Sequence, residues 1–138
     1  KRLQSKLKFN NLSDHINFLG WKNDQELNNI YKSSRALLLT SKAEGLPMVV
    51  IEAMSHGLPV FVTSVGDLPW LINDGVEGRI IKYGKTNEMA KAIIEELLNE
   101  NHLNEMGKNA YNRIISLIPE FSPIKVSMTW KKIMNSLV

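Results

Sequence analysis

The chain has 138 residues, about the size of one domain, and 43% of them are hydrophobic, enough to bury a core. It has no cysteine, which excludes disulfides, thiolate nucleophiles and cysteine-based metal sites and fits a reducing cytoplasm. The net charge is only +3 and the lysines are scattered, so no nucleic-acid partner is expected, whereas an anionic small molecule or membrane surface is compatible. No apolar run approaches the roughly 18 residues needed to span a bilayer, and none follows the basic N-terminus as in a signal peptide.

The first forty residues predict two helices and two strands. In chain order these are a helix around Leu3 and Leu7, the strand HINFLG (15–20), a helix over Leu27, Ile30 and Tyr31, and the strand ALLLT (36–40). Asp24 can cap the second helix. Both segments have two or more apolar residues in a row without polar alternation, which is typical of strands covered on both faces of a parallel sheet.

The middle of the chain predicts one helix and two further strands. Pro47 is well placed as the first helical residue, because its missing N–H would have no partner there in any case. Gly57 should end this helix, since glycine adopts the left-handed conformation common at helix C-termini. The strands that follow are PVFVTS (59–64) and GRIIK (78–82).

The last third predicts three helices. Thr86 caps the first, whose apolar side chains recur every four residues at Met89, Ile93 and Leu97. The second carries Leu103, Met106, Ala110, Ile114 and Leu117, and the third, opened by Ser122-Pro123, carries Val126, Trp130, Ile133, Met134 and Leu137. If the stripe on the third helix is left bare, it invites dimerisation of the fragment.

Alternating strands and helices predict an α/β fold, an open parallel sheet of the doubly wound type with helices on both faces. Four strands are few for such a sheet, and no strand precedes the first helix. We therefore expect residues 1–138 to be a single lobe that is truncated at its N-terminal end.

The most informative stretch is EGLPMVVIEAMSHGLPVFVT, where Glu44 and Glu52 stand among apolar and small residues. A buried carboxylate is costly unless it is hydrogen-bonded. Glu44 follows a strand, where ligands of α/β sheets bind, and Gly45 allows a ligand to approach the backbone closely. The helix start offers unpaired N–H groups, from about Met48 to Val50, that suit phosphate or sugar oxygens. Sugar hydroxyls would satisfy both carboxylates, so the layout suggests a sugar-nucleotide site.

Spacing alone leaves other readings open. Glu44 is also explained as a favourable charge before a helix, and Glu52 as a residue that faces solvent or meets a lysine. The histidines His15, His56 and His102 lack metal-ligand spacing, and His56 is well placed as a helix C-terminal cap.

Several linked motifs extend the signal over essentially the whole chain. In order, they are Glu44, Glu52, Ala53-Met54, Gly57-Leu58-Pro59-Val60, Val65-Gly66, Asp74-Gly75 and Gly78, flanked by INFLGW and ELNNIYKSSRALLLTS upstream and by EMGKNAYNRI downstream. This series resembles the C-terminal, donor-binding domain of the retaining group 1 glycosyltransferases. That family has the two-lobed GT-B fold, whose lobes are Rossmann-like parallel sheets with helices on both faces.

The resemblance implies a role for each matching position. Glu44 would be the catalytic residue, in contact with the transferred sugar, and Glu52 would hold the ribose hydroxyls of the donor. Further donor contacts would come from the backbone of Gly45, Leu46, Pro47, Met48 and Val49. The nucleotide base would meet the turn formed by Leu19, Gly20, Trp21 and Lys22. The motif requires no cofactor and no metal.

The same resemblance implies a hexosyltransferase that uses a UDP- or GDP-hexose and a glycan or lipid-linked acceptor in bacterial-style polysaccharide biosynthesis. It would work in the cytoplasm, at the inner face of the membrane if the full-length protein associates with it peripherally. The acceptor-binding N-terminal lobe and the basic pair for the diphosphate are missing, so we expect the isolated fragment to be inactive. Two departures, Asp67 for a glycine and Trp70 for an acidic residue, affect the loop between them. The alternatives are a non-catalytic sugar-nucleotide-binding module and another GT-B enzyme, such as a nucleotide-sugar epimerase.

Overall fold

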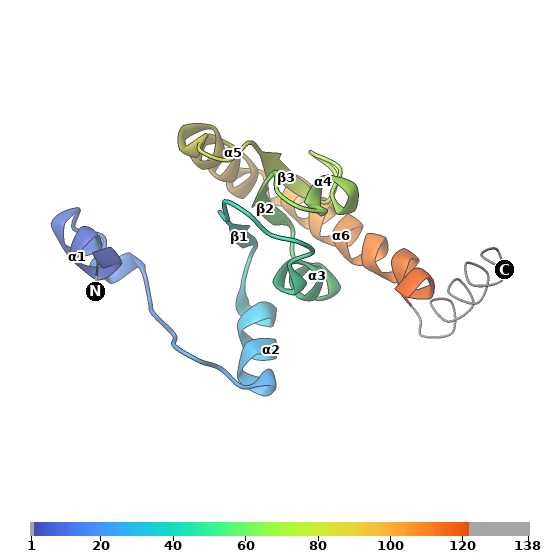
Figure 1. Ribbon diagram of the computed structural model, residues 1–138, viewed down its shortest axis with the longest axis horizontal. Coiled ribbons are helices and arrows are strands. Elements are labelled where there is room, and N and C mark those ends of the chain that lie inside the picture. The colour runs from blue at the N-terminus through green and yellow to red at the C-terminus, as the bar shows by residue number, and fades with distance from the viewer. Residues whose placement is uncertain (1, 122–138) are drawn as a thin grey trace, which may run out of the picture. The chain divides into compact units, whose positions relative to one another are not determined.

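The computed structural model describes residues 2–121, which divide into two compact units with the boundary between Ile30 and Tyr31 (Figure 1). Each unit is described by itself. The elements are α1 (Arg2–Phe9), η1 (Ser13–His15), α2 (Asp24–Ser33), β1 (Leu37–Leu39), α3 (Met48–Ser55), β2 (Val60–Thr63), α4 (Leu68–Leu71), β3 (Gly78–Ile81), α5 (Thr86–Leu98) and α6 (Glu100–Phe121). The predicted last helix, with its stripe from Val126 to Leu137, lies outside the described residues.

In the first unit, the predicted strand HINFLG (15–20) is wrong. Residue 15 ends the short helix η1, and residues 16–20 pair with no strand in the described part of the chain. A strand needs a partner for its N–H and C=O groups, and an apolar run cannot supply one. The cap of α2 also differs by one residue: Asn23, not Asp24, accepts a hydrogen bond from the Glu26 N–H at 2.9 Å, and Glu26 accepts one from the Asn23 N–H at 3.1 Å. This reciprocal pair is a capping box.

The second unit contains a parallel sheet of three strands in the order β1-β2-β3. Leu37 lies opposite Val60, and Val60 lies opposite Gly78, so the strands start nearly level. All four residues of β2 are buried, as expected for the central strand of a sheet that is covered on both faces. The three strands predicted over 36–40, 59–64 and 78–82 and their parallel arrangement are confirmed, with slightly shorter bounds.

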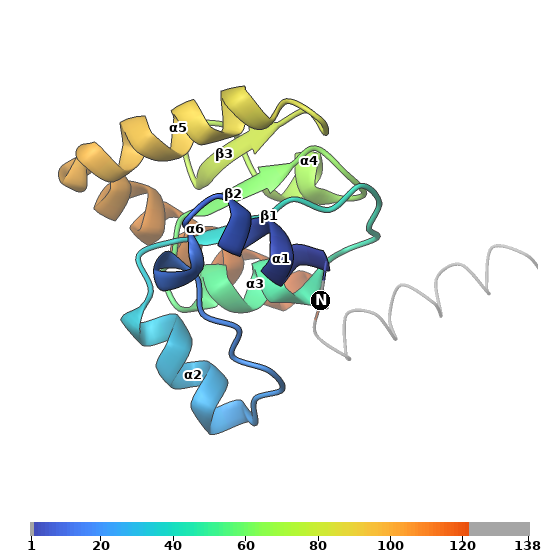
Figure 2. The same cartoon turned by 90° about the vertical axis from the view of Figure 1, so that its left-hand side faces the viewer.

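Helices cover both faces of this sheet. Figure 2 shows α5 along one face, and α3 and α6 on the opposite side. On the α5 side, one hydrophobic cluster forms. Its members are Phe61 and Ile81 from the strands, Met89 and Ala92 from α5, and Leu103 from the start of α6. On the other side, α3 contributes Val50, Ala53 and Met54, and α6 contributes Met106 and Ala110, all with 0% exposure. The predicted parallel α/β fold with helices on both faces is confirmed. Thr86 begins α5 and Lys85 takes the cap position, one residue from the prediction.

The end of α3 is fixed by glycine, as predicted. Gly57 has φ +72°, its N–H donates to the Met54 carbonyl, and the Leu58 N–H donates to the Ala53 carbonyl. These two bonds form a Schellman motif with His56 as the C-cap residue, which confirms the structural interpretation of that histidine. α6 crosses at this point, because a Cβ added at Gly107 would overlap the Gly57 carbonyl oxygen.

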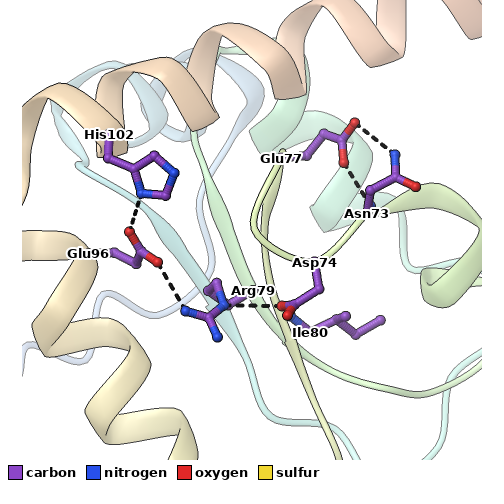
Figure 3. A network of polar contacts seen from close by, with 7 residues as sticks. All are labelled: Asn73, Asp74, Glu77, Arg79, Ile80, Glu96 and His102. Carbon is purple, nitrogen blue, oxygen red and sulfur yellow. Dashed lines mark hydrogen bonds and ion pairs between the residues drawn. The ribbon is translucent and has the colours of Figure 1, made fainter.

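A polar network joins β3 to α5 and α6 (Figure 3). Arg79 donates from Nε to Asp74 Oδ1 at 3.1 Å and from Nη1 to Glu96 Oε1 at 3.0 Å. The other Glu96 oxygen lies 2.6 Å from His102 Nδ1. The pKa of Arg79 is raised because the hydrogen bonds and charges of Glu96 and Asp74 outweigh its partial burial. The arginine therefore compensates the charge of the buried Glu96.

Gly107→Ala should destabilise the protein. In an ordinary helix interior this change favours folding by up to about 1 kcal/mol. Here the new methyl group meets the Gly57 carbonyl and lies 3.3 Å from Pro59 Cδ, so we expect a net loss of about 1–3 kcal/mol. Urea unfolding measures this loss, with Asn112→Ala on the exposed side of α6 as the control. Equal or higher stability of Gly107→Ala would contradict the close crossing of α3 and α6.

Candidate functional site

The candidate site is built on the loop that connects β1 to α3, residues 40–47. This loop is held by β2 and by the loop that follows β2. The buried Thr63, at the end of β2, donates from Oγ1 to the Ser41 carbonyl at 2.6 Å. The Asp67 N–H donates to the Gly45 carbonyl at 3.2 Å. Both anchors lie at the carboxyl edge of the sheet, where ligands of open α/β sheets bind.

Gly66 brings the two loops into direct backbone contact. Its φ is +53°, and a Cβ at this position would overlap the carbonyl oxygens of both Glu44 and Gly45. Any other residue would be strained by the positive φ and would push the first loop away. The Val65-Gly66 motif therefore positions the loop that carries Glu44. Asp67, which departs from the family pattern, contributes its backbone N–H, which any residue other than proline provides.

The N-terminus of α3 differs slightly from the prediction. Pro47 is the cap residue, with φ −72° and ψ 112°, and Met48 is the first helical residue. No side chain caps this end, and the Val50 N–H donates to the Pro47 carbonyl at 3.0 Å. Within the described residues, the N–H groups of Met48 and Val49 remain available, whereas that of Val50 does not. The predicted set of free N–H groups is correct for two of its three members.

Glu44 and Gly45 are exposed, as are Met48 and Val49, whereas Leu46 is half-buried and Pro47 is buried. A hollow of about 410 Å³ opens at the carboxyl edge of the sheet, but these residues do not line it. It is formed instead by Thr40, Thr63, the loop over residues 82–85 and the start of α5. The structure thus places the Glu44 loop and the start of α3 together on an open surface.

Glu52 is half-buried, and within the described residues it forms no ion pair with a lysine. Tyr31, in the last turn of α2 and in the same unit, donates from its hydroxyl to Glu52 Oε2 at 2.9 Å. Tyr31 is only 6% exposed, and its ring lies on that of His56 with centroids 4.9 Å apart. Burial, followed by the hydrogen bond to Glu52 and the charge of Glu52, raises the pKa of Tyr31 to about 12. The phenol therefore stays a hydrogen-bond donor at neutral pH.

The predicted base-binding turn belongs to the first unit. Gly20 has φ +66°, Leu19 and Trp21 are exposed, and the Trp21 side chain is 86% accessible. Lys22 forms an ion pair with Glu26 at 3.1 Å. The turn thus presents an aromatic ring that is free of packing within this unit. The roles assigned to Glu44, to the Gly45–Val49 backbone, to Glu52 and to this turn stay predictions.

Sequence reasoning missed two contributors to the site. Tyr31 was assigned only to an apolar helix face, and Thr63 only to a strand. The available signal was that Tyr31 is the polar-tipped residue on the apolar face of Leu27 and Ile30, and that Thr63 begins the polar end of the segment PVFVTS. Within residues 2–121 we find no cluster of three or more acidic or histidine side chains that could hold a metal ion. In the same residues, no helix combines the length and apolar character of a membrane span.

The fold and the site define a Rossmann-like α/β lobe with an open helix terminus beside a loop glutamate. The sequence model of the family described as "Glycosyl transferases group 1" matches residues 1–113. The chain therefore belongs to the group 1 glycosyltransferases. It is 32% identical over 119 residues to UDP-Gal:alpha-D-GlcNAc-diphosphoundecaprenol alpha-1,3-galactosyltransferase of Escherichia coli, a match that covers 83% of this chain and 30% of the relative. The chain thus spans about a third of the length of that protein.

Two solved structures support the assignment of the fold. Sucrose-phosphate synthase from Thermosynechococcus elongatus superposes with a TM-score of 0.84 and 25% identity, over 99% of this chain and 33% of the synthase. The C-terminal domain of a group 1 glycosyl transferase from Francisella tularensis gives a TM-score of 0.75 with 21% identity, over 83% of this chain and 60% of that domain's chain. The predicted fold class and the resemblance to the C-terminal domain of GT-B glycosyltransferases are confirmed. The single-lobe boundary, the location in the cell, the absence of a cofactor, membrane association and dimerisation stay predictions.

Gly66→Ala should loosen the loop that carries Glu44. The methyl group cannot fit against the Glu44 and Gly45 carbonyls, so we expect a loss of about 1–3 kcal/mol in stability and faster amide exchange over residues 41–47. Hydrogen-exchange mass spectrometry measures the second effect. Gly45→Ala is the matched control, because its Cβ would meet no atom within 4 Å. Equal exchange in both variants would show that Gly66 does not hold the loop.

Proposed function

We propose that this chain forms the donor-binding part of a retaining glycosyltransferase that moves a hexose from a UDP- or GDP-sugar to a glycan or lipid-linked acceptor in polysaccharide biosynthesis. One observation carries the proposal. The backbone of the loop with Glu44 is held by Gly66 and Thr63 beside the start of α3, where no side chain caps the helix. Glu44 therefore lies at the same carboxyl edge of the sheet as the N–H groups of Met48 and Val49, which have no partner within the described residues. A carboxylate that accepts hydrogen bonds from hydroxyls, beside N–H groups that donate to phosphate oxygens, suits a sugar diphosphate.

The family and the relatives support this reading. The name of the Escherichia coli relative specifies a UDP-sugar donor and a lipid-linked diphosphate acceptor. A negatively charged donor also fits the small positive net charge of the chain, which has 17 basic and 14 acidic residues. The proposal assigns no role to a metal ion, because the N–H groups at the helix start would bind the diphosphate oxygens.

Each residue has a distinct part in the proposed reaction. Glu44 accepts hydrogen bonds from hydroxyls of the hexose, the N–H groups of Met48 and Val49 meet the diphosphate, and Glu52 accepts from the ribose. The sugar–phosphate bond breaks while a bond forms from the acceptor hydroxyl on the same face of the sugar. The hydroxyl proton passes to the leaving diphosphate. Both glutamates act by positioning and electrostatics, and neither becomes covalently attached to the sugar.

Glu52→Gln should weaken nucleotide binding while the fold is kept, because the amide oxygen can still accept the Tyr31 hydrogen bond. Loss of a charged acceptor for ribose hydroxyls should raise the Kd for UDP or GDP by about 10- to 100-fold, or about 1–3 kcal/mol. Isothermal titration calorimetry on the full-length protein measures this change. The exposed Glu105→Gln on α6 is the control. Unchanged affinity for both nucleotides in Glu52→Gln would remove the ribose role.

Glu44→Ala should weaken the binding of a nucleotide sugar but not the binding of the nucleotide alone. UDP has no hexose, so its affinity should stay within about twofold of the wild type. The additional affinity of UDP-glucose, UDP-galactose or GDP-mannose over the parent nucleotide should fall by about tenfold, the value of one charged hydrogen bond. The same calorimetric titrations give both numbers, with Glu105→Ala as the control. If nucleotide and nucleotide sugar lose affinity equally, Glu44 does not contact the transferred sugar.

A further inference from the structure

The glutamates that serve the fold have both carboxylate oxygens occupied. Figure 3 shows this for Glu77 and Glu96. Glu77 accepts from the Asn73 N–H at 2.7 Å and from the Asn73 side-chain amide at 3.2 Å. Glu96 is held by Arg79 on one oxygen and by His102 on the other. Both side chains are buried, and a buried carboxylate is costly unless its oxygens are hydrogen-bonded.

Glu52 differs from both of them. Within residues 2–121, the hydrogen bond from Tyr31 to Oε2 is the only one that reaches its carboxylate. The described part of the chain leaves no buried side-chain nitrogen or oxygen without a partner, so Oε1 is open to solvent. One oxygen is therefore fixed by the protein, and the other keeps access to solvent.

Tyr31 is built to hold that arrangement. Its ring is buried and packs on His56, whose Nδ1 lies 2.8 Å from the Glu52 carbonyl at the C-terminal end of the same helix. The hydroxyl is thus fixed by packing against residues adjacent to its acceptor. Its raised pKa, about 12, keeps the proton on the phenol at physiological pH. A glutamate side chain with three rotatable bonds would otherwise sample several positions.

We infer that Tyr31 is a positioning residue for the nucleotide: its hydroxyl fixes the Glu52 carboxylate so that Oε1 receives a ribose hydroxyl of the donor. The inference rests on the proposed function, because it assigns the ligand of Glu52 to the ribose. Preorganisation of this kind improves affinity by removing the ordering cost on binding. The ribose then meets a carboxylate whose orientation is already fixed, rather than one that rotates freely.

The test compares Tyr31→Phe with the wild type in the full-length protein. Phenylalanine keeps the ring on His56 and removes only the hydroxyl. Calorimetry is carried out with UDP and GDP and with their 2′-deoxy and 3′-deoxy forms. We expect the ribonucleotide to bind about three- to tenfold more weakly to Tyr31→Phe, and the preference for ribose over the deoxy sugars to shrink. A purely structural role of Tyr31 would not change that preference.

Controls separate the possible outcomes. Tyr111→Phe, at an exposed tyrosine on α6, should match the wild type. If Tyr31→Phe lowers the melting temperature strongly, Tyr31→Met provides the second variant without a hydroxyl. If Glu52→Gln binds UDP and GDP like the wild type, the proposed function fails and the inference with it. If Glu52→Gln is weakened but Tyr31→Phe is not, or if Tyr31→Phe keeps its full preference for ribose, the inference alone is overturned.

Discussion

The candidate site depends on one contact, in which the backbone of Gly66 lies directly against the carbonyls of Glu44 and Gly45. Among the described strands, β1 is only three residues long and lies at the edge of the sheet. β2 is buried throughout and fixes the loop that follows β1 twice, through Thr63 and through the Gly66–Asp67 turn. The position of Glu44 is therefore determined by the best-buried strand, and the site inherits the rigidity of the core.

The motifs that carry the family resemblance divide into two physical classes. The stretch from Glu44 to Glu52, with Gly66, shapes the open edge of the sheet. Asp74 and Gly78 serve the fold: Asp74 accepts hydrogen bonds from Arg79 and from the Ile80 N–H, and Gly78 leaves room for the Val60 backbone. α6 supports the same region, because Arg113 donates to the Leu71 and Trp70 carbonyls and its guanidinium lies 5.8 Å from the Trp70 ring. The Trp70 side chain, at a position where the family often has an acid, is 54% exposed, and its ring contacts this guanidinium.

Most local elements could be predicted from the sequence. The predictions failed where a residue's structure or contact depends on a partner far away in the sequence. The segments at 36–40, 59–64 and 78–82 form strands because they pair side by side in one parallel sheet, whose central strand is buried throughout. The similar run at 15–20 has no neighbour in the described chain and forms no strand. Helix starts shifted by one residue: Asn23 and Lys85 take the cap positions expected for Asp24 and Thr86, and α3 begins at Met48, one residue after the expected Pro47. The bond from Tyr31 to Glu52 joins residues 21 apart, a contact that no local pattern encodes.

The energetics of α3 explain why the carboxylate of Glu52 is informative. Val50, Ala53 and Met54 are completely buried, so the direction of the helix and of residue 52 is fixed by packing alone. A glutamate placed there for stability would be expected to have both carboxylate oxygens paired, as Glu77 and Glu96 have. Glu52 instead receives a single hydrogen bond and keeps a half-buried charge, which costs more than an apolar side chain of similar size would. A charge that the fold only partly compensates supports the proposal that Glu52 meets a ligand, and hydroxyl donors on that ligand would satisfy the carboxylate without adding charge.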